Sequence, residues 1–496
     1  MRFVKNFSTK TKGICTVAIL RTGKQEKKQD RRRRVRARRV RIGTADARLT
    51  GAAGVEAVRE LDRVLGITGA LDEGVGAVKV RRRGLSAGQL LVAIASCQLA
   101  EGDFLVSLDR RRDDVAGQLL EPVATPAATT AAGIARRFTG QHLRGIETAL
   151  GRLNTRFLAR LPASRRLALL KVATIDGDAT DVEVYGREKE KAQYTHTGQR
   201  NLRQHIGHWA EAGVPLALEV MAGAADPRSN SVQMLDRSIA ALPAGVKKVR
   251  ARWDAGYFAG ELAQACVERG VDFAIGAKRT PPIFRAATAV PDHRWVPAIG
   301  MEDTELAVVD YLPGAWPDGV VCIARRTRIP VEKIPSARAR KRRTVPKDQL
   351  ALALGGTVDH VFGYSFILTN LDVTTDERLA EVEWWYRHRT DIEALNKDAK
   401  HGAALRHMPS KYHAINSVWA WGALLACAFS AWLQELTGID HGNGRGRRTL
   451  ARLCRELINV PARVLRSAGA TVLRLPPGEQ LLAVVLPRLQ QLPGPG

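Results

Sequence analysis

Residues 383–400 read EWWYRHRTDIEALNKDAK, and the fold and chemistry of the chain are best inferred outward from them. The segment lacks glycine and proline and follows a polar region rich in helix breakers, so it is predicted to form a helix of about five turns. At about 100° per residue, four of its polar side chains fall within roughly a 60° arc of that helix. They are Tyr386, Arg389, Glu393 and Lys400.

This stripe has the chemistry of a site that holds a metal ion beside a phosphate chain. Glu393 would supply hard oxygen ligands for Mg²⁺, Arg389 would clamp a phosphate with paired hydrogen bonds, and Lys400 would add a point charge. The alternative is a solvated helix face on which Glu393 and Arg389 form a weak ion pair. For each residue taken alone, the solvated face is the more common arrangement.

The spacing as a whole resembles a known signature. The four residues occur in the order Tyr, Arg, Glu, Lys and are separated by two, three and six residues. This pattern is similar to that of the DDE transposases of bacterial insertion sequences, in the group typified by insertion sequence 4. The text that follows, HGAALRHMPS at 401–410 and then an apolar helix, resembles the branch named for insertion sequence 1380. The resemblance implies an α/β fold with an RNase H-like core of the retroviral integrase type. It also implies two further catalytic acids.

Composition indicates a polyanionic partner. The chain has 496 residues, with 77 Lys and Arg against 50 Asp and Glu, which gives a formal charge of +27. Nucleic acid is the simplest partner for such a charge, although a ribosomal or membrane-surface role would also fit the charge alone. The charge therefore indicates the class of partner but does not indicate which reaction, if any, the protein catalyses.

Neither a disulfide framework nor a membrane span is predicted. The six cysteines are scattered without a CxxC pair, which favours a reducing cytosol, with the protein associated with the nucleoid. The N-terminus lacks the apolar core of a signal peptide. The longest apolar run, Val418 to Leu433, is shorter than the roughly 20 residues that a membrane span needs, so it is predicted to be a buried core helix.

The N-terminal third is predicted to bind DNA. Residues 1–48 include the run KKQDRRRRVRARRVR at 27–41, which is expected to be a disordered basic arm, or a tail that only adds solubility. Residues 49–162 have helical periodicity, with a capping box at Ser86 and Gln89. Two helices on either side of Arg136 and Arg137 could form a helix-turn-helix, and a helical packing domain is the alternative.

Residues 163–278 change to a strand pattern with interspersed helices. The expected elements are strands at Leu167–Ile175, Thr180–Tyr185 and Val214–Met221, a helix at Ser231–Leu242, a strand at Lys247–Trp253, a helix at Phe258–Arg269 and a strand at Asp272–Ala277. This order matches the RNase H-like core that the resemblance implies. That core is completed by residues 373–435, with a β-rich insertion at 279–372 and a basic helical region at 436–496.

The resemblance places the acids on this core. Asp178 follows the first strand, Asp254 ends the fourth, and Glu393 lies on the later helix, as expected of a DDE triad. Periodicity cannot separate Asp178 from Asp176, which would project from the same strand face. The family pattern of Asp, a small residue and Thr is matched only at Asp178. Asp254 could instead cap the helix that follows it, and the two roles are compatible.

The insertion contains aromatic strands and the basic run that begins at Arg338. In the family such an insertion holds DNA beside the active site. Tyr364 or Phe366 could stack on an unpaired base, but an aromatic residue in a strand is more often part of the core.

The resemblance implies Mg²⁺-dependent strand cleavage at the ends of a mobile element, followed by strand transfer to target DNA. Asp178, Asp254 and Glu393 would hold two Mg²⁺ ions, with Mn²⁺ as a substitute, and Tyr386, Arg389 and Lys400 would contact DNA phosphates. A homodimer is expected in the synaptic complex. A metal-dependent nuclease without joining activity, and a non-catalytic DNA-binding relic or regulator, are the alternatives. Whether a hairpin intermediate forms is open.

Overall fold

The computed structural model describes residues 27–31, 40, 42–79, 83–195, 198–334, 343–439, 446–478 and 480–495. The chain divides into two compact units, Met1–Ala47 and Arg48–Gly496. Most of the basic run at 27–41 and the run that begins at Arg338 lie outside the described residues.

The second unit begins with a short strand and a group of helices. They are β1 Leu49–Thr50, α2 Val55–Leu65, α3 Ile67–Val75, α4 Ala87–Leu99, α5 Ser107–Asp113, α6 Val115–Gln118, α7 Ala128–Ala135 and α8 Gly140–Arg160. The predicted capping box is present, because the Ser86 hydroxyl accepts from the Gln89 amide and the Gln89 side chain accepts from the Ser86 amide. Leu61, Leu90, Ile146 and Leu153 are fully or almost fully buried, so the helical periodicity correctly identified core faces.

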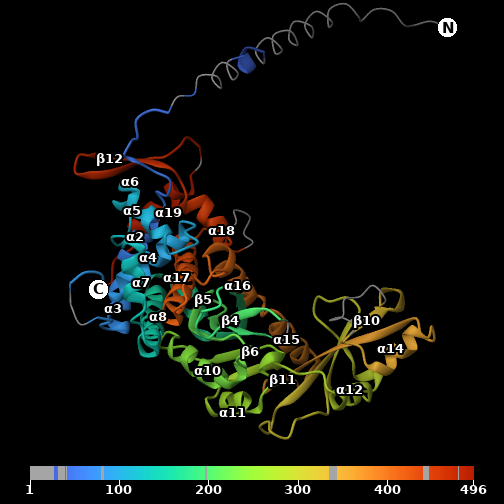
Figure 1. Cartoon of the computed structure of the whole chain (residues 1–496). Helices are drawn as coiled ribbons and strands as arrows, with labels where there is room; N and C mark the ends of the chain where they lie inside the picture. Colours follow the sequence, from blue (N-terminus) through green and yellow to red (C-terminus); the bar gives the residue numbers. More distant parts are fainter. Residues whose placement is uncertain are drawn as a thin grey trace, which may run out of the picture. The chain divides into compact units, whose positions relative to one another are not determined.

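A mixed sheet runs from β4 and β5, beside the helices, out to β10 (Figure 1). Its first part contains β2 Ala173–Glu183, β3 Gln193–Tyr194, β4 Arg200–Trp209, β5 Val214–Ala222, β6 Val249–Trp253 and β7 Asp272–Gly276. β5 pairs with β4 and β4 with β2, both antiparallel, while β6 lies parallel to β2 and β7 parallel to β6. Three antiparallel strands followed by two parallel strands, in the order β5-β4-β2-β6-β7, is the arrangement expected for an RNase H-like core.

The predicted boundaries of the first two strands were wrong. Residues from Leu167 to Lys171 belong to helix α9, Ala163–Lys171, in which Leu167 is 64% exposed and Leu169 is buried. The extended chain begins at Val172, where β-branched residues replace the Leu and Arg residues, which are unbranched at Cβ and favour a helix. β2 then runs without interruption through Asp176, Asp178 and Asp181, so the predicted second strand is the outer half of β2. The true second strand is β4.

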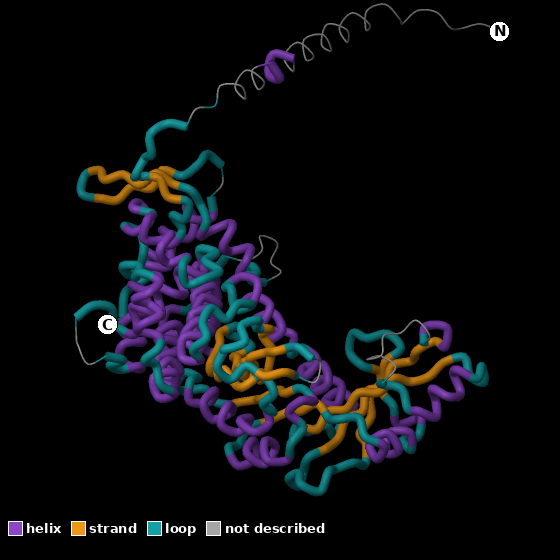
Figure 2. The backbone as a smooth tube through the Cα atoms, in the orientation of Figure 1, coloured by secondary structure: helices purple, strands orange, loops and turns teal. Residues whose placement is uncertain are grey.

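The β-rich insertion continues the same sheet. Its elements are α12 Pro281–Thr288, β8 Val296–Pro297, β9 Thr304–Val309, β10 Val321–Pro330, α14 Lys347–Leu354 and β11 His360–Thr369. β11 pairs antiparallel with β7 through Ile367 and Gly276, and β10, β9 and β8 follow outward in that order. Figure 2 shows these strands alongside those of the core. Tyr364 and Phe366 are each 3% exposed, so they are core residues.

Different helices cover the two faces of the core strands. α10, Ser231–Ala240, lies against β4, where Gly207 leaves space for the Ser238 side chain. On the opposite face, side chains of α16, Thr390–Gly402, reach Asp178 and Thr180 of β2. α11, Gly260–Glu268, packs against β7.

The helix predicted for residues 383–400 is two helices. α15, Asp376–Arg387, ends at His388, and α16 begins after Arg389. The His388 imidazole contacts the Trp384 carbonyl at 2.6 Å, and the Arg389 amide bonds to the Tyr386 carbonyl in a tight turn. These local bonds compete with a continuous helix. The single stripe expected from Tyr386 to Lys400 is therefore divided between two helices.

The C-terminal part contains α17 His413–Thr437, α18 Leu450–Leu453, β12 Ala462–Ser467, β13 Ala470–Arg474 and α19 Leu481–Gln490. α17 is long and apolar enough to cross a membrane by composition, but 94% of its most apolar window is buried within the protein, as expected of a core helix. β1, β12 and β13 form a separate small sheet, and β12 was not predicted. The described cysteines are free and buried.

Candidate active site

Two neighbouring strands bring the first two predicted acids together. In the parallel pairing of β2 with β6, Gly177 lies opposite Trp253. Asp178 is the next residue of β2, and Asp254 is the first residue after β6 ends, so the two acids occupy adjacent positions. Their proximity is reflected in the pKa of Asp178, which the negative charges of Asp254 and Glu393 help to raise.

Glycine at position 177 is required by the neighbouring strand. A Cβ atom there would overlap the six-membered ring of the Trp253 indole. The indole is fully buried and packs against the ring of Tyr257, with 4.8 Å between the ring centroids. Gly177 therefore allows β2 and β6 to pair closely immediately before Asp178 and Asp254.

Asp176 and Asp178 have different environments. Asp176 is 0% exposed and forms a paired ion bridge with Arg252 on β6, with oxygen to nitrogen distances of 2.6 and 2.8 Å. Burial raises the pKa of Asp176 to about 7, although the charge of Arg252 opposes this. Arg252 also donates to the Trp385 carbonyl on α15 at 2.6 Å. Asp176 thus links β2, β6 and α15 inside the protein.

Asp178 is 18% exposed at its side chain, and the side chains of Asn396 and Arg389 contact it. Asn396 Nδ2 donates to Oδ2 at 2.7 Å, and an Arg389 nitrogen lies 3.7 Å from Oδ1. Burial is the main cause that raises the pKa of Asp178 to about 6, the Arg389 charge lowers it, and Asp254 and Glu393 raise it further. A nearby cation would therefore favour the charged form of Asp178.

Asp254 begins a tight turn rather than a long helix. Its Oδ1 accepts from the Gly256 amide at 2.8 Å, so it caps the single helical turn Ala255–Tyr257. Tyr386 reaches the same point from α15, because its hydroxyl donates to the Trp253 carbonyl at 3.2 Å. Burial raises the pKa of Tyr386 to about 12, which keeps the phenol protonated.

α16 places the other predicted residues along β2. Lys400 Nζ donates to the Thr180 hydroxyl at 2.5 Å and to the Asp181 carbonyl at 3.0 Å, and burial lowers the pKa of Lys400. Glu393 is exposed and has no hydrogen-bond or ion-pair partner among the described residues. The structure thus brings all six predicted side chains to one region, on β2, the end of β6, α15 and α16.

The donor chemistry of this region suits a divalent cation, because Asp178, Asp254 and Glu393 offer hard oxygen ligands, and the negative charges of Asp254 and Glu393 help to raise the pKa of Asp178. Within the part of the chain that the structure describes, no three His, Cys, Asp or Glu side chains are grouped closely enough to hold a metal ion. The side chains must therefore shift if one ion is to contact all three acids. Release of the Arg389 contact is one such shift.

Sequence reasoning missed Asn396, although its position carried a signal. Asn396 lies three residues after Glu393 and four before Lys400, on the same face of the helix. Arg252 gave no such signal, because its partner Asp176 is 76 residues away in the sequence.

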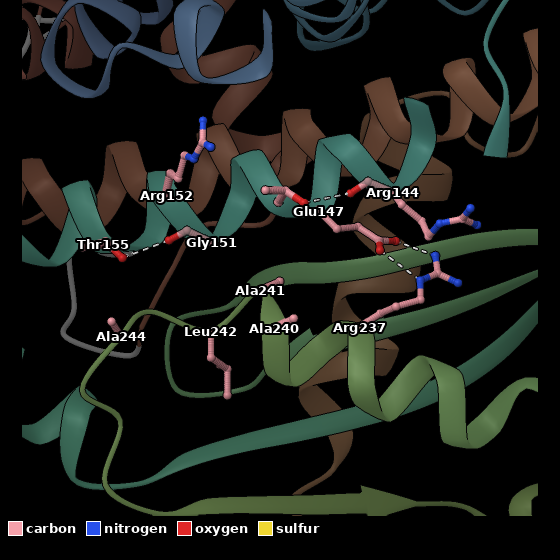
Figure 3. A pocket seen from close by; sticks show the side chains of 11 residues that line it. Arg144, Glu147, Gly151, Arg152, Thr155, Arg237, Ala240, Ala241, Leu242 and Ala244 are labelled. Carbon is pink, nitrogen blue, oxygen red and sulfur yellow. Dashed lines mark hydrogen bonds and ion pairs between the residues drawn. The ribbon is translucent and has the colours of Figure 1, made fainter. Parts of the chain in front are cut away.

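A cavity of about 500 Å³ between α8 and α10 contains none of the predicted site residues (Figure 3). At its wall, Arg237 on α10 pairs with the buried Glu147 on α8. Glu147 also accepts from the Leu218 amide of β5 at 3.2 Å. These bonds attach α8 to the edge of the sheet, so the polar groups here have a structural role.

A family model and a solved structure show similarity to this chain. A profile of the family described as transposase DDE domain group 1 matches residues 32–338, which is more than half of the chain. This segment contains Asp178 and Asp254 but ends before Glu393. A cryo-EM structure of a piggyBac transposase synaptic complex with hairpin DNA shows 9% identity and a TM-score of 0.41, covering 81% of this chain and 79% of that chain. No curated protein sequence matches.

Proposed function

Because the chain belongs to the family of transposases with a group 1 DDE domain, and is thus a DDE transposase enzyme, we propose that it cuts and joins DNA at the ends of an insertion sequence. The spacing of Tyr386, Arg389, Glu393 and Lys400 supports the group typified by insertion sequence 4 and the branch named for insertion sequence 1380. The substrate is double-stranded DNA, both as transposon ends and as target.

One observation carries the assignment of the site. Parallel strands β2 and β6 place Asp178 and Asp254 at adjacent positions, and α16 brings Glu393 near enough to affect the pKa of Asp178. We assign these three acids as the ligands of the catalytic cations. Asp176 is excluded from this role because both of its oxygens bond to Arg252 in the interior.

The proposed mechanism needs positioning and charge neutralisation, and no nucleophilic side chain. Asp178, Asp254 and Glu393 would hold two Mg²⁺ or Mn²⁺ ions, which when bound would supply activation of the attacking water or 3′-hydroxyl and stabilisation of the leaving oxygen. Arg389 is half-buried beside Asp178 and carries the guanidinium geometry that grips a phosphate with two bonds. Lys400 adds positive charge beside Thr180. The protonated Tyr386 hydroxyl would donate to a phosphate oxygen by giving up its bond to the Trp253 carbonyl.

Other parts of the chain are assigned to DNA recognition and assembly. We propose residues 1–48 as a basic arm, 49–162 as the DNA-binding domain, 163–278 with 373–435 as the catalytic core, 279–372 as its insertion, and 436–496 as a basic C-terminal region. The Arg136 guanidinium lies 3.8 Å from the centre of the Tyr412 ring, so Arg137 and Arg144, which have no ion-pair partner among the described residues, are better candidates for DNA contact. A homodimer would pair two transposon ends, and the protein would act in the cytoplasm at the nucleoid.

The test is incubation of the protein with Mg²⁺ and a pair of inverted-repeat ends taken from the DNA that flanks its gene. Joined products support the transposase. Cleavage without joining supports a nuclease on the same core, and binding without cleavage supports a regulator or relic.

Substitution of the acids tests the site separately from the fold. Asp254→Ala or Glu393→Gln should abolish cleavage while DNA affinity stays within a few-fold, because most affinity comes from Lys and Arg contacts to phosphate. Asp398→Asn is the matched control on α16, since Asp398 is a neighbouring acid outside the proposed triad. Strand transfer by either triad variant would contradict the assignment.

A further inference from the structure

We propose that Asn396 is a positioning residue that orients the carboxylate of Asp178 for metal binding. The inference rests on the proposed role of Asp178 as a ligand. Asn396 belongs to α16, and its Nδ2 donates to Asp178 Oδ2 at 2.7 Å. This contact is shorter than that of Arg389, whose nitrogen lies 3.7 Å from Oδ1.

The contact is one of two that align α16 with β2. Asn396 bonds to Asp178, and Lys400 bonds to Thr180 at 2.5 Å. Four residues of helix advance about 6 Å and two residues of strand about 6.6 Å, so the two pairs lie at matching intervals along both elements. Glu393, one turn before Asn396, is held on the same face of α16. Asn396 thus helps to fix the position of α16, which carries Glu393, relative to Asp178 on β2.

The orientation of the Asn396 amide follows from its partner. An ionised carboxylate only accepts hydrogen bonds, so the amide nitrogen must face Asp178. The amide oxygen is then left buried without a hydrogen-bond partner. A buried polar atom without a partner lowers stability, and an apolar side chain would avoid that loss. Asn396 is therefore better explained by the site than by the packing of α16.

A neutral amide has an advantage over a charged donor at this position. It fixes one carboxylate oxygen while leaving the negative charge of Asp178 available to a cation. Arg389, which faces the other oxygen at 3.7 Å, is the contact that an incoming phosphate can remove. Partners of this kind set the direction of a metal ligand, and their loss typically weakens metal affinity or activity by about 10–100-fold.

The experiment measures Mn²⁺ binding to the full chain without DNA by electron paramagnetic resonance. Asn396→Ala should raise the Kd for Mn²⁺ by about tenfold. The metal concentration for half-maximal cleavage should rise in parallel, with DNA affinity within twofold of wild type. Asn396→Leu, which also removes the unpartnered oxygen, should show the same metal defect and keep thermal stability; it replaces the alanine variant if that variant does not fold.

Asn154→Ala is the matched control. Asn154 is fully buried on α8, and its Nδ2 donates to the Ala241 carbonyl at 3.1 Å, away from the acids. Its truncation should lower thermal stability and leave the Mn²⁺ Kd unchanged. An unchanged Mn²⁺ Kd in folded Asn396→Ala and Asn396→Leu would overturn the positioning role. Failure of the wild type both to bind Mn²⁺ and to cleave would instead overturn the function on which the inference rests.

Discussion

Gly177→Ala tests whether the close pairing of β2 and β6 positions the two acids. The added Cβ would overlap the Trp253 indole, which is fully buried. The ring cannot move freely, because it contacts Tyr257 at 4.8 Å and His205 at 6.3 Å between ring centroids. Overpacking of this kind costs about 1–3 kcal/mol. We expect the upper end, about 3 kcal/mol, because the obstacle is a rigid ring held from two sides.

The effect on activity should be larger than the effect on stability suggests. Relief of the overlap must move β2 or β6 just before Asp178 and Asp254. A displacement of about 1 Å in a catalytic group can reduce the rate about 100-fold. Urea unfolding gives the stability change, and cleavage of end DNA, measured where the variant is still folded, gives the rate.

Gly133→Ala is the control for the substitution itself. Gly133 lies within α7, and a Cβ there meets nothing within 4 Å. Alanine should therefore stabilise this helix by about 0.5–1 kcal/mol. In the double variant Gly177→Ala with Trp253→Leu, the two losses should be less than additive by about 1 kcal/mol or more. A Gly177→Ala protein with wild-type urea midpoint and cleavage rate would refute the reasoning.

Three further outcomes follow from individual contacts. Arg252→Met should lower the unfolding free energy by about 3–5 kcal/mol in urea titrations, since it leaves Asp176 buried without its partner. Burial, with the charges of Arg447 and Arg252, lowers the pKa of His208 to about 3, whereas an unfolded histidine titrates near 6.5. The unfolded state then binds more protons between these values, so stability should fall as pH drops below about 6.5, by up to about 1.4 kcal/mol per pH unit, and His208→Leu should weaken this dependence. Lys400→Met should reduce the slope of log Kd for DNA against log salt by about 0.9 if the ammonium contacts a phosphate; an unchanged slope would remove Lys400 from the DNA interface.

The core strands were largely predictable because their burial leaves a local pattern. β5, β6 and β7 are short apolar segments bounded by polar or turn residues, and all are close to the predicted ranges. The error at residues 167–171 has the same origin. An apolar run is compatible with a strand or a buried helix, and periodicity alone does not separate them.

Pairings between distant segments were not predictable from one sequence. The joining of the insertion to the core depends on the contact of β11 with β7, where Ile367 lies opposite Gly276. No local pattern in either strand specifies its partner. Likewise, periodicity left two candidate acids on β2, and the bonds of Asp176 to Arg252 on the next strand give a physical difference between them that no local pattern showed.

The break at Arg389 explains how one short segment can hold both strands of the site. Before the break, Tyr386 on α15 bonds to the end of β6 at the Trp253 carbonyl. At the break, an Arg389 nitrogen lies 3.4 Å from the Gly177 carbonyl of β2. After it, Asn396 and Lys400 bond along β2. A straight helix would keep these side chains on one narrow face, whereas the turn at His388 lets them follow two strands. Residues 386–400 therefore attach to both strands, beside the adjacent positions of Asp178 and Asp254.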